Sequence, residues 1–549
     1  YIIPTDDYHH SEYVGDYFKF REYITGFTGS AGTAVFTKDK AGLWTDGRYF
    51  IQAEAQLQGS GITLYKSGEP GVPTIEEFLK SELKEGDVLG FDGRTVTYAQ
   101  GKRYCHIADE NGASLKYSLD FAQNIWKERP EMSMESVFSL ADEYTGEKIG
   151  SKLERIREIM KENGCNAHVL SSLDDIAWLL NIRGNDIAYC PLVLSYAIVY
   201  NNSVELFADI RKFSDDIINL LAENQVKIYP YEDIYRKVSE MTSEDKLLLD
   251  SAIMNYSLYQ SISKETVIVD KQNPEILMKS VKNETQAENL RKAHLKDAVA
   301  HTKFMYWLKK NIGRVEITEL SASARLEGLR AEQEHFLGPS FGPISAYGEH
   351  GAIVHYSADE KSNVPLKEGK LFMTDTGGHY LEGSTDITRT VALGEVGNLE
   401  KEHFTLVARA MLRLANTVFL YGCSGANLDC IAREVFWKEG LNFNHGTGHG
   451  VGYLLNIHEG PINFRWKEGE RPAPALEENM VITDEPGIYI EGSHGIRLEN
   501  ELLVRKTVKN EYGQFMNFEI LTYVPIDLDA ILPEKMSTEE KEMLNHYHK

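Results

Sequence analysis

The chain has 549 residues, of which 42% are hydrophobic and 26% are charged, as in an ordinary globular protein. Its formal net charge of −25 disfavours nucleic acid and anionic lipid surfaces as partners, because like charges oppose encounter. The sequence shows no run of about 18 apolar residues, so we expect no membrane span, and its first residues lack the apolar stretch of a secretory signal. The length predicts three or four domains.

The cysteines are odd in number and scattered along the chain. They are Cys105, Cys165, Cys190, Cys423 and Cys430, and no two form a Cys-x-x-Cys pair. This pattern indicates neither a disulfide framework nor a thiolate metal site. A reducing cytoplasm fits it best, so we predict a cytoplasmic protein.

Two stretches in the first half of the chain echo each other. Each contains a β-rich run, which ends at Arg48 in the first copy and at Arg211 in the second. An amphipathic, helix-like segment follows in each copy, and then a short strand-like piece. The helices are expected at 51–57 and 213–221, and the strands at 62–65 and 226–229. The repetition predicts a duplicated α/β domain.

Two boundaries divide the chain into three predicted domains. The polar, proline-bearing stretch 127–136 is typical of a linker, and a second boundary falls near Asn273–Pro274. From Glu275 onward, apolar residues recur at helical spacing and predict a long amphipathic helix. We therefore expect domains at 1–146, 147–278 and 279–549, with the chemistry in the last.

Asp375 and Asp386 stand eleven residues apart, each in a β-prone run, with glycines between them. This arrangement predicts a hairpin that carries two carboxylates into one site. The alternative is a pair of solvated turn residues, which are common beside glycine. Against that alternative, both aspartates adjoin apolar residues, and a carboxylate without compensation is costly to bury there. Glu485 follows an apolar run in the same way.

The segment 445–452 alternates glycine with other residues and contains His445 and His449. A helix is disfavoured because each glycine costs about 1 kcal/mol relative to alanine. In an extended segment the two histidines still share a face, since the side-chain period is two. A phosphate-binding loop is a weak alternative, because no lysine follows and no ordinary helix start is visible.

Four carboxylates and one imidazole are then available for metal binding, from Asp375, Asp386, His449, Glu485 and Glu499. About four negative charges neutralise two divalent cations, and an oxygen-rich, sulfur-free set favours Mn(II), with Co(II) or Zn(II) as substitutes. Two such ions roughly 3.5–4 Å apart share a bridging water, lower its pKa and polarise the carbonyl that it attacks. The sequence therefore predicts metal-assisted hydrolysis.

Three further residues are candidates for supporting roles. His355 and His458 lie at the ends of apolar runs, where a histidine is more often structural, but near the metals they could stabilise an oxyanion or hold a leaving nitrogen. Arg497 precedes Glu499 by two residues, and strand alternation would place the two side chains together. Such a cation would orient a metal ligand; an exposed ion pair is the alternative.

The strings around these residues form a family pattern. They are Thr-Asp-Ile-Thr-Arg, His-Gly-Thr-Gly-His-Gly-Val-Gly, His-Glu-Gly-Pro, Thr-Asp-Glu-Pro-Gly and Gly-Ile-Arg-Leu-Glu-Asn. With them the chain resembles the pita-bread metallopeptidases, most closely the three-domain, cytosolic type of Xaa-Pro aminopeptidase, or aminopeptidase P. The resemblance runs nearly end to end and includes 26–33 and 44–50 in the first domain. One departure is Ile488, where an aromatic residue is common.

The resemblance implies an α/β (α+β) fold with two related, creatinase-like N-terminal domains, 1–146 and 147–278, and a catalytic pita-bread domain, 279–549. It implies a metal-dependent aminopeptidase that hydrolyses the N-terminal Xaa-Pro bond, with a metal-bridging hydroxide as the nucleophile. The expected substrates are peptides with proline at the second position, and the family pattern is a homodimer.

The resemblance also implies a role for each matching residue. Two cations would be held by Asp375, Asp386, His449, Glu485 and Glu499, with Glu499 as a bridge and Glu485 also as the proton shuttle. The substrate would be contacted by His355 and His458, the proline pocket lined by His445, and the substrate reached by Arg48 from the first domain. Tyr489 and Arg497 would support the ligands.

Two other functions stay open. A prolidase has the same ligand set but cleaves only Xaa-Pro dipeptides; two N-terminal domains rather than one favour the aminopeptidase. A non-catalytic pita-bread module that binds peptides or histones would typically lack some ligands, and here every ligand position is filled. Creatinase-like proteins, which use the fold without metal, are discounted for the same reason.

Overall fold

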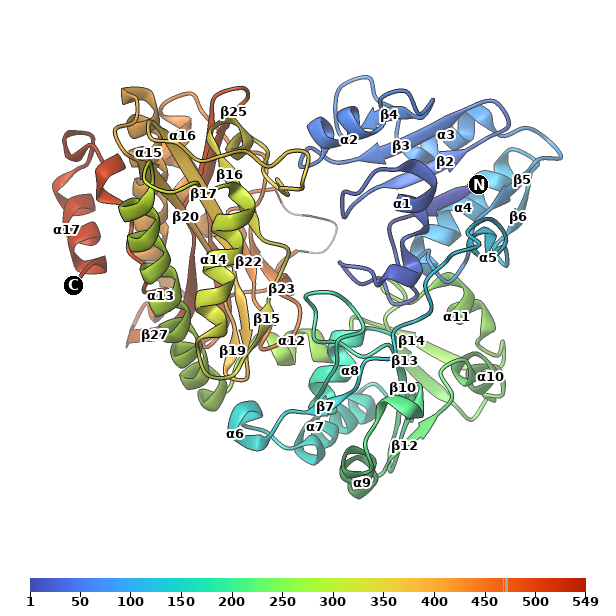
Figure 1. Ribbon diagram of the computed structural model, residues 1–549. Helices are drawn as coiled ribbons and strands as arrows, with labels where there is room; N and C mark the ends of the chain where they lie inside the picture. Colours follow the sequence, from blue (N-terminus) through green and yellow to red (C-terminus); the bar gives the residue numbers. More distant parts are fainter. Residues whose placement is uncertain (468, 470–471) are drawn as a thin grey trace. The chain divides into compact units, whose positions relative to one another are not determined.

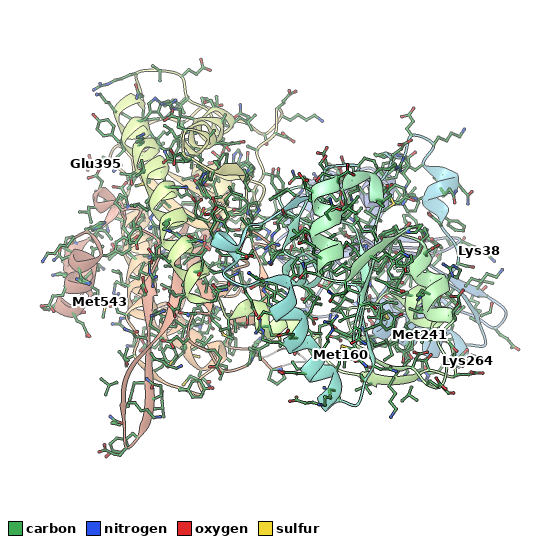
Figure 2. The ribbon with its side chains drawn as sticks, turned by 90° about the horizontal axis from the view of Figure 1, so that it is seen from below. Lys38, Met160, Met241, Lys264, Glu395 and Met543 are labelled. Carbon is green, nitrogen blue, oxygen red and sulfur yellow. The ribbon has the colours of Figure 1, made fainter. Side chains whose placement is uncertain are left out.

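The computed structural model describes residues 1–467, 469 and 472–549 and shows two compact units (Figure 1). The first unit comprises 1–141 and 147–276, and the second comprises 142–146 and 277–549. Figure 2 labels Met160 and Met241 in the core of the first unit and Met543 in the last helix of the second. Within the described residues, no helix combines the length and the apolar character that a bilayer crossing requires.

The first unit contains a four-stranded sheet of order β1-β2-β3-β4, a six-stranded sheet of order β12-β11-β10-β8-β13-β14, and two strand pairs, β5-β6 and β7-β9. Its strands are β1 (Ile2–Pro4), β2 (Thr33–Phe36), β3 (Ala41–Thr45), β4 (Thr63–Lys66), β5 (Val88–Gly90), β6 (Ser114–Lys116), β7 (Phe138–Ser139), β8 (Ala167–Leu170), β9 (Ile182–Arg183), β10 (Tyr196–Tyr200), β11 (Val204–Phe207), β12 (Val226–Tyr229), β13 (Lys246–Leu249) and β14 (Val267–Asp270). Its helices are α1 (Phe20–Thr25), α2 (Phe50–Gln56), α3 (Ile75–Glu82), α4 (Tyr98–Glu110), α5 (Phe121–Ile125), α7 (Ile149–Glu162), α8 (Leu173–Leu179), α9 (Asp215–Glu223), α10 (Asp233–Ser239) and α11 (Tyr256–Ser261).

The two halves of this unit repeat one topology. An antiparallel pair is followed by a helix and a parallel strand in both, as β2-β3-α2-β4 and as β10-β11-α9-β12. A second parallel pair with a helix between its strands follows in each, β5-β6 around α4 and β13-β14 around α11. The expected helices at 51–57 and 213–221 and strands at 62–65 and 226–229 are therefore confirmed to within two residues.

The long helix expected from Glu275 is two helices, α12 (Pro274–Ser280) and α13 (Glu284–Asn311). The break has a local cause. Asn283 caps α13: its side chain accepts from the backbone N–H of Gln286, and the Gln286 side chain accepts from that of Asn283. Val281 just before it forms a bridge with Met480. A capping box fixes the start of a helix, because the residues before it take non-helical geometry. The apolar pattern therefore runs through the break, but α12 and α13 are separate helices.

The second unit contains β16-β17-β20, β15-β18-β19, the hairpin β25-β26 and a six-stranded sheet of order β21-β28-β27-β24-β22-β23. Its strands are β15 (Phe336–Pro339), β16 (Ile344–Tyr347), β17 (Lys370–Thr376), β18 (Gly378–Tyr380), β19 (Gly383–Ser384), β20 (Ile387–Leu393), β21 (Phe419–Leu420), β22 (Gly448–Gly450), β23 (Glu459–Phe464), β24 (Val481–Asp484), β25 (Gly487–Ile490), β26 (His494–Arg497), β27 (Asn500–Asn510) and β28 (Gly513–Ile520). Its helices are α6 (Asp142–Thr145), α13, α14 (Glu319–Ala331), α15 (Asn398–Ala415), α16 (Gly425–Trp437) and α17 (Thr538–Tyr547).

Two helix pairs cover the sheets of this unit. Phe304 of α13 and Leu326 of α14 pack in one core with Phe372 of β17 and Val391 of β20. The helices α15 and α16 share a larger core with β24, β27 and β28. The strands between the two cores, together with the connections next to them, carry every predicted metal ligand.

A short piece of the preceding chain belongs to this second unit. α6 packs on α13, where the side-chain amides of Asn283 and Asn289 donate to the carbonyl oxygens of Thr145 (2.8 Å) and Glu143 (2.9 Å). Residues 142–146 are thus folded with the later domain although they precede residue 147 in sequence.

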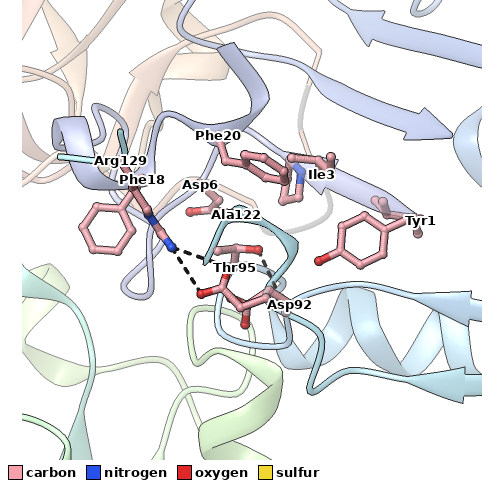
Figure 3. A pocket seen from close by; sticks show the side chains of 12 residues that line it. Tyr1, Ile3, Asp6, Phe18, Phe20, Asp92, Thr95, Ala122 and Arg129 are labelled. Carbon is pink, nitrogen blue, oxygen red and sulfur yellow. Dashed lines mark hydrogen bonds and ion pairs between the residues drawn. The ribbon is translucent and has the colours of Figure 1, made fainter. Parts of the chain in front are cut away.

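Figure 3 shows a pocket of the first unit, lined by residues of β1 and by side chains such as Phe18, Asp92 and Arg129. Its carboxylates are paired with nearby side chains: Arg129 Nη1 lies 3.2 Å from Asp120 Oδ2, Arg94 binds both Asp92 and Asp120, and Asp6 lies 2.6 Å from His10 Nδ1. Because these charges are paired, we interpret the pocket as part of the packing around β1.

Gly425, the first residue of α16, marks the closest approach between that helix and β23. A Cβ atom at this position would lie 1.7 Å from the carbonyl oxygen of Asn463. We expect Gly425→Ala to lower the free energy of unfolding of the second unit by more than about 2 kcal/mol, because helix and strand must separate.

Gly328→Ala is the matched control, since an added methyl meets open space in the exposed part of α14. This change should raise stability by about 0.5–1 kcal/mol through the higher helix propensity of alanine. Thermal denaturation measures both effects. Equal melting temperatures for the two variants would contradict the close approach.

Candidate metal centre

Asp375 and Asp386 come from neighbouring antiparallel strands. Asp375 lies in β17 and pairs in register with Thr388, while Asp386 immediately precedes β20. Both side chains are buried. The expected hairpin is therefore confirmed, with the short strands β18 and β19 inserted between its two arms. Adjacent positions on one strand pair bring both carboxylates to one side of the site.

The other three predicted ligands come from the six-stranded sheet and its connections. His449 is the central residue of β22, and Glu485 directly follows β24 with its N–H donating to the carbonyl oxygen of Thr447 (2.8 Å). Glu499 lies between β26 and β27, and its carboxylate accepts from the Thr388 hydroxyl (2.7 Å). The last contact ties Glu499 to the strand that follows Asp386.

The glycines around His449 serve close approach of backbones. A Cβ at position 448 would lie 1.8 Å from the carbonyl oxygen of Thr483, and one at position 450 would lie 2.2 Å from that of Glu459. The segment is a strand between two others, as the extended conformation predicted, and not a helix. Its narrow spacing brings His449 between β23 and β24.

The five side chains converge into overlapping groups. The possible ligand atoms of Asp375, Asp386 and Glu499 lie within 4.8 Å of one another, as do those of His449, Glu485 and Glu499, and those of Asp386, His449 and His458. Asp386, His449 and Glu499 each belong to two groups, and two of these three residues are carboxylates, which can bridge cations. Shared members are what a pair of adjacent cations with bridging ligands requires.

The pKa values of the carboxyl groups indicate whether this donor set suits divalent cations. Burial, followed by repulsion from Asp375, raises the pKa of Asp386 to about 7. Burial likewise raises the pKa of Glu485 to about 7, and burial together with the charges of Asp386 and Glu485 raises that of Glu499 well above its usual value. Such carboxylates are held in ionised form only by nearby positive charge, so the set fits two divalent cations.

Arg497 supplies fixed positive charge beside the ligands. Its guanidinium is buried and donates to Asp375 and, at 2.7 Å, to the hydroxyl oxygen of Tyr489. The expected partner Glu499 is therefore replaced by Asp375. The cause is local: β26 ends at Arg497 and β27 begins at Asn500, so the strand alternation that would align positions 497 and 499 stops between them.

A hydrogen-bonded chain continues from Arg497 to His445. The Tyr489 hydroxyl lies 2.8 Å from His445 Nε2, and His445 Nδ1 lies 2.7 Å from the carbonyl oxygen of Gly446. Burial, then the charge of Arg497, lowers the pKa of His445 to about 3, so the ring is neutral. With Nδ1 donating to Gly446, Nε2 accepts from Tyr489.

The remaining predicted residues lie at different distances from the centre. His458 is part of it, with its ring centroid 4.2 Å from that of His449. His355 lies in a turn next to Val354, whose carbonyl oxygen is 3.4 Å from Arg497 Nη2. Arg48 belongs to the first unit, where it binds Asp46 (2.8 Å), and its reach to the substrate stays a prediction.

Several residues behind the aspartates had no sequence prediction. Glu501 accepts from the N–H of Asp386 (2.7 Å) and lies 3.1 Å from His294 Nε2. Asp297 accepts from the Thr385 hydroxyl and from Arg330 Nε (2.7 Å), and Arg330 also donates to the carbonyl oxygen of Thr376 (3.1 Å). These buried groups fix the residues next to both aspartates. Their signal was a polar stripe, at 294, 297 and 301, on the apolar face of α13.

Models of known families cover most of the chain. Two models described as Creatinase/Prolidase N-terminal domain match residues 19–116 and 128–286. The model of metallopeptidase family M24 matches 288–506, and that of the C-terminal region of peptidase M24 matches 514–549. Together with the site, these matches define a metal-dependent peptidase with creatinase-type N-terminal domains.

Relatives that match the full length of the chain indicate which kind of metallopeptidase it is. The chain is 36% identical to Xaa-Pro aminopeptidase 1 of Dictyostelium discoideum, over 100% of this chain and 89% of that protein. It is 35% identical to Aminopeptidase P1 of Arabidopsis thaliana, over 100% and 92%. The crystal structure of X-prolyl aminopeptidase from Caenorhabditis elegans, described as a cytosolic enzyme with a di-nuclear active site, matches with a TM-score of 0.94 at 35% identity and covers 100% of this chain and 90% of that one.

The chain therefore belongs to the Xaa-Pro aminopeptidase (aminopeptidase P) family. It is a metallopeptidase, and the predicted fold class and family are confirmed.

Asp297 offers a test of the framework behind the ligands. We expect Asp297→Asn to weaken divalent cation binding about 10- to 100-fold, because the hydroxyl of Thr385 and the guanidinium of Arg330 lose the charge that holds them in place. Calorimetric titration of the metal-free protein with Mn(II) measures the change.

Glu332→Gln is the control, since this carboxylate at the end of α14 is exposed and lies 3.9 Å from Lys303. Its affinity for Mn(II) should equal that of the unchanged protein. Unaltered affinity in a folded Asp297→Asn protein would show that the framework does not act on the metal ligands.

Proposed function

We propose that this chain removes the first residue from peptides that carry proline at the second position. The observation that carries the proposal is the convergence of five ligand side chains into groups that share Asp386 and Glu499. The names of the full-length relatives agree with it. The domain limits 1–146, 147–278 and 279–549 are part of the same proposal.

Two divalent cations would be held by Asp375, Asp386, His449, Glu485 and Glu499. Mn(II) is the proposed metal, with Co(II) or Zn(II) as substitutes, because the donors are hard oxygens and an imidazole without thiolates. When bound, the cations would activate a water molecule and polarise the scissile carbonyl. Arg497 keeps the Asp375 carboxylate oriented toward them.

Glu485 is the proposed proton carrier. Its carboxylate forms one group with His449 and Glu499, so it would lie beside the water that the cations activate. It would take the proton of the attacking water and deliver it to the proline nitrogen as the bond breaks. His458, beside His449, and His355, near Arg497, would donate to the carbonyl oxygen and hold the leaving nitrogen.

The preference for proline follows from the amide that it forms. An Xaa-Pro bond has no N–H and restricts the residue before it, so enzymes that rely on backbone pairing bind it poorly. Here the free amine of the peptide would meet the carboxylates and cations. The neutral His445 ring, held by Tyr489, would form a wall for the pyrrolidine ring, and Arg48 would contact the substrate from the first unit.

We further propose a cytoplasmic homodimer without nucleic acid partners. The five cysteines are free, which suits a reducing compartment. The formal net charge of −25 opposes binding to a phosphate backbone.

Replacement of Glu485 tests its role. We expect Glu485→Ala to lower kcat roughly 10³-fold or more, because both a metal ligand and the proton carrier are lost, while the fold persists. Turnover of Arg-Pro-Pro by the Mn(II)-loaded protein is the measurement, with circular dichroism as the check on folding. Glu478→Ala, which removes a carboxylate bound to Lys506 (3.1 Å), should keep full activity. Substantial turnover by Glu485→Ala would refute the proton-carrier role.

Substrate length separates the aminopeptidase from a prolidase. We expect the Mn(II)-loaded protein to release arginine from Arg-Pro-Pro, and a chelator to stop the reaction. A protein that cleaves Arg-Pro but leaves Arg-Pro-Pro intact would be a dipeptidase. A protein that binds these peptides without any chelator-sensitive cleavage would be a non-catalytic module.

A further inference from the structure

An exposed group of aromatic and basic side chains lies at the end of β23. It consists of Arg465, Trp466 and Lys467, which follow β23, and Trp437, the last residue of α16; we name these four residues the outer rim. The two indole rings meet edge to face at a centroid distance of 5.7 Å, and the Lys467 ammonium lies 4.8 Å from the centroid of Trp466. Both indoles remain more than two fifths exposed. Fixed but exposed indoles are typical of binding surfaces.

The outer rim is connected directly to the proposed proline pocket. Gly446 follows His445, and a Cβ at position 446 would lie 3.0 Å from Arg465 Nε. The side chain of Arg465 therefore packs against this glycine, the residue that follows His445. The strand register explains the contact, because Gly448 pairs with Phe464 and the N–H of Thr447 donates to the Phe464 carbonyl oxygen (2.8 Å).

A second connection reaches His445 from Trp437. The indole N–H of Trp437 donates to the Asn442 side-chain oxygen (3.2 Å), which also accepts from Arg433 Nη1 (3.2 Å). Arg433 Nη2 donates to the carbonyl oxygen of His445 (2.6 Å). Arg433 is itself buried and bound to Asp429 (2.6 Å), so this connection is rigid. Both arms of the outer rim are thus positioned on the segment that carries His445.

The geometry points to a single occupant for this surface. We infer that the outer rim binds the part of the peptide substrate beyond proline, with its indoles against the side chains and Arg465 and Lys467 on the C-terminal carboxylate. The inference rests on the proposed function, which sets the amine end of the peptide at the metal ligands and proline at His445. Each further residue extends the chain by at most roughly 3.3–3.6 Å, so residues beyond proline would continue outward from the segment that carries His445.

Charge supports the choice of a peptide acid. The chain as a whole is strongly acidic, and the proposed function places the amine end of the peptide at the metal ligands. Arg465 and Lys467 present the opposite charge beyond the proline pocket. A short peptide with a free amine and a free carboxylate matches both ends, whereas a peptide amide matches one.

Three substrates distinguish the outer rim from the centre: Ala-Pro-NH2, which has no residue beyond proline, and Ala-Pro-Ala-Ala-Phe as the free acid and as the amide. For the Mn(II)-loaded protein at low salt, we expect kcat/KM to be roughly three- to five-fold higher on the acid than on the amide, as for an exposed charge pair. The preference should shrink in 0.5 M salt, because the Debye length there lies between about 3 and 10 Å. Arg465→Gln should reduce this preference, and the double variant Arg465→Gln/Lys467→Gln should abolish it.

Trp437→Ala should lower kcat/KM on both pentapeptides roughly five-fold, as expected for a lost aromatic contact, and leave Ala-Pro-NH2 unchanged. Tyr512→Ala, which removes an aromatic ring that is 75% exposed in the β27–β28 hairpin, is the matched control and should change none of the three. Equal losses on all three substrates, or no loss on the pentapeptides, would overturn the inference.

Failure of the proposed function has a different signature. If the Mn(II)-loaded protein cleaved none of the three substrates, the function would be wrong, and tryptophan fluorescence during titration with the pentapeptide acid would then decide about the outer rim. A fluorescence change that disappears in Trp437→Ala supports the inference, and an identical response in both proteins refutes it.

Discussion

Repulsion among buried carboxylates is the constraint on which the second unit depends. Four carboxylates converge here, those of Asp375, Asp386, Glu485 and Glu499. The raised pKa values of Asp386, Glu485 and Glu499 show how unfavourable their charged form is without cations. A cluster of this kind is a site where stability is given up for function. The ligands come from two places, the β17–β20 pair and the six-stranded sheet. Two separately packed cores therefore share the free-energy cost of holding the carboxylates together.

The surroundings of the ligands follow from the same constraint. Arg497 is the buried cation closest to the aspartates, and its bond to Tyr489 connects them to His445. On the opposite side, the pair of Asp297 and Arg330 holds the backbone next to both aspartates. The two sets of contacts hold the ligands in place before any cation binds, so a metal ion would have little to rearrange.

The sequence singled out five side chains as ligands, and the structure brings their possible ligand atoms together. The signals were aspartate beside apolar residues and glycine alternating around histidine, which leave few other interpretations. The buried polar residues behind the ligands were not predicted. A helical period of apolar residues does not reveal that His294 and Asp297 on the same face are also buried. The prediction that Arg497 pairs with Glu499 was wrong, because it assumed strand alternation across Leu498, where the chain forms no strand. The break before α13 was missed because the apolar pattern runs through it, although the capping box of Asn283 and Gln286 is a local motif.

The placement of α6 has a practical consequence for dissecting the molecule. A fragment that started at residue 279 would lack residues 142–146, and the side-chain amides of Asn283 and Asn289 at the start of α13 would lose the α6 carbonyl groups to which they donate. Cutting the polypeptide at its apparent sequence boundary would thus expose the first turns of a helix that carries half of the buried framework. An excised peptidase module would need that five-residue segment restored, as a graft or as an added peptide, to keep this helix end covered.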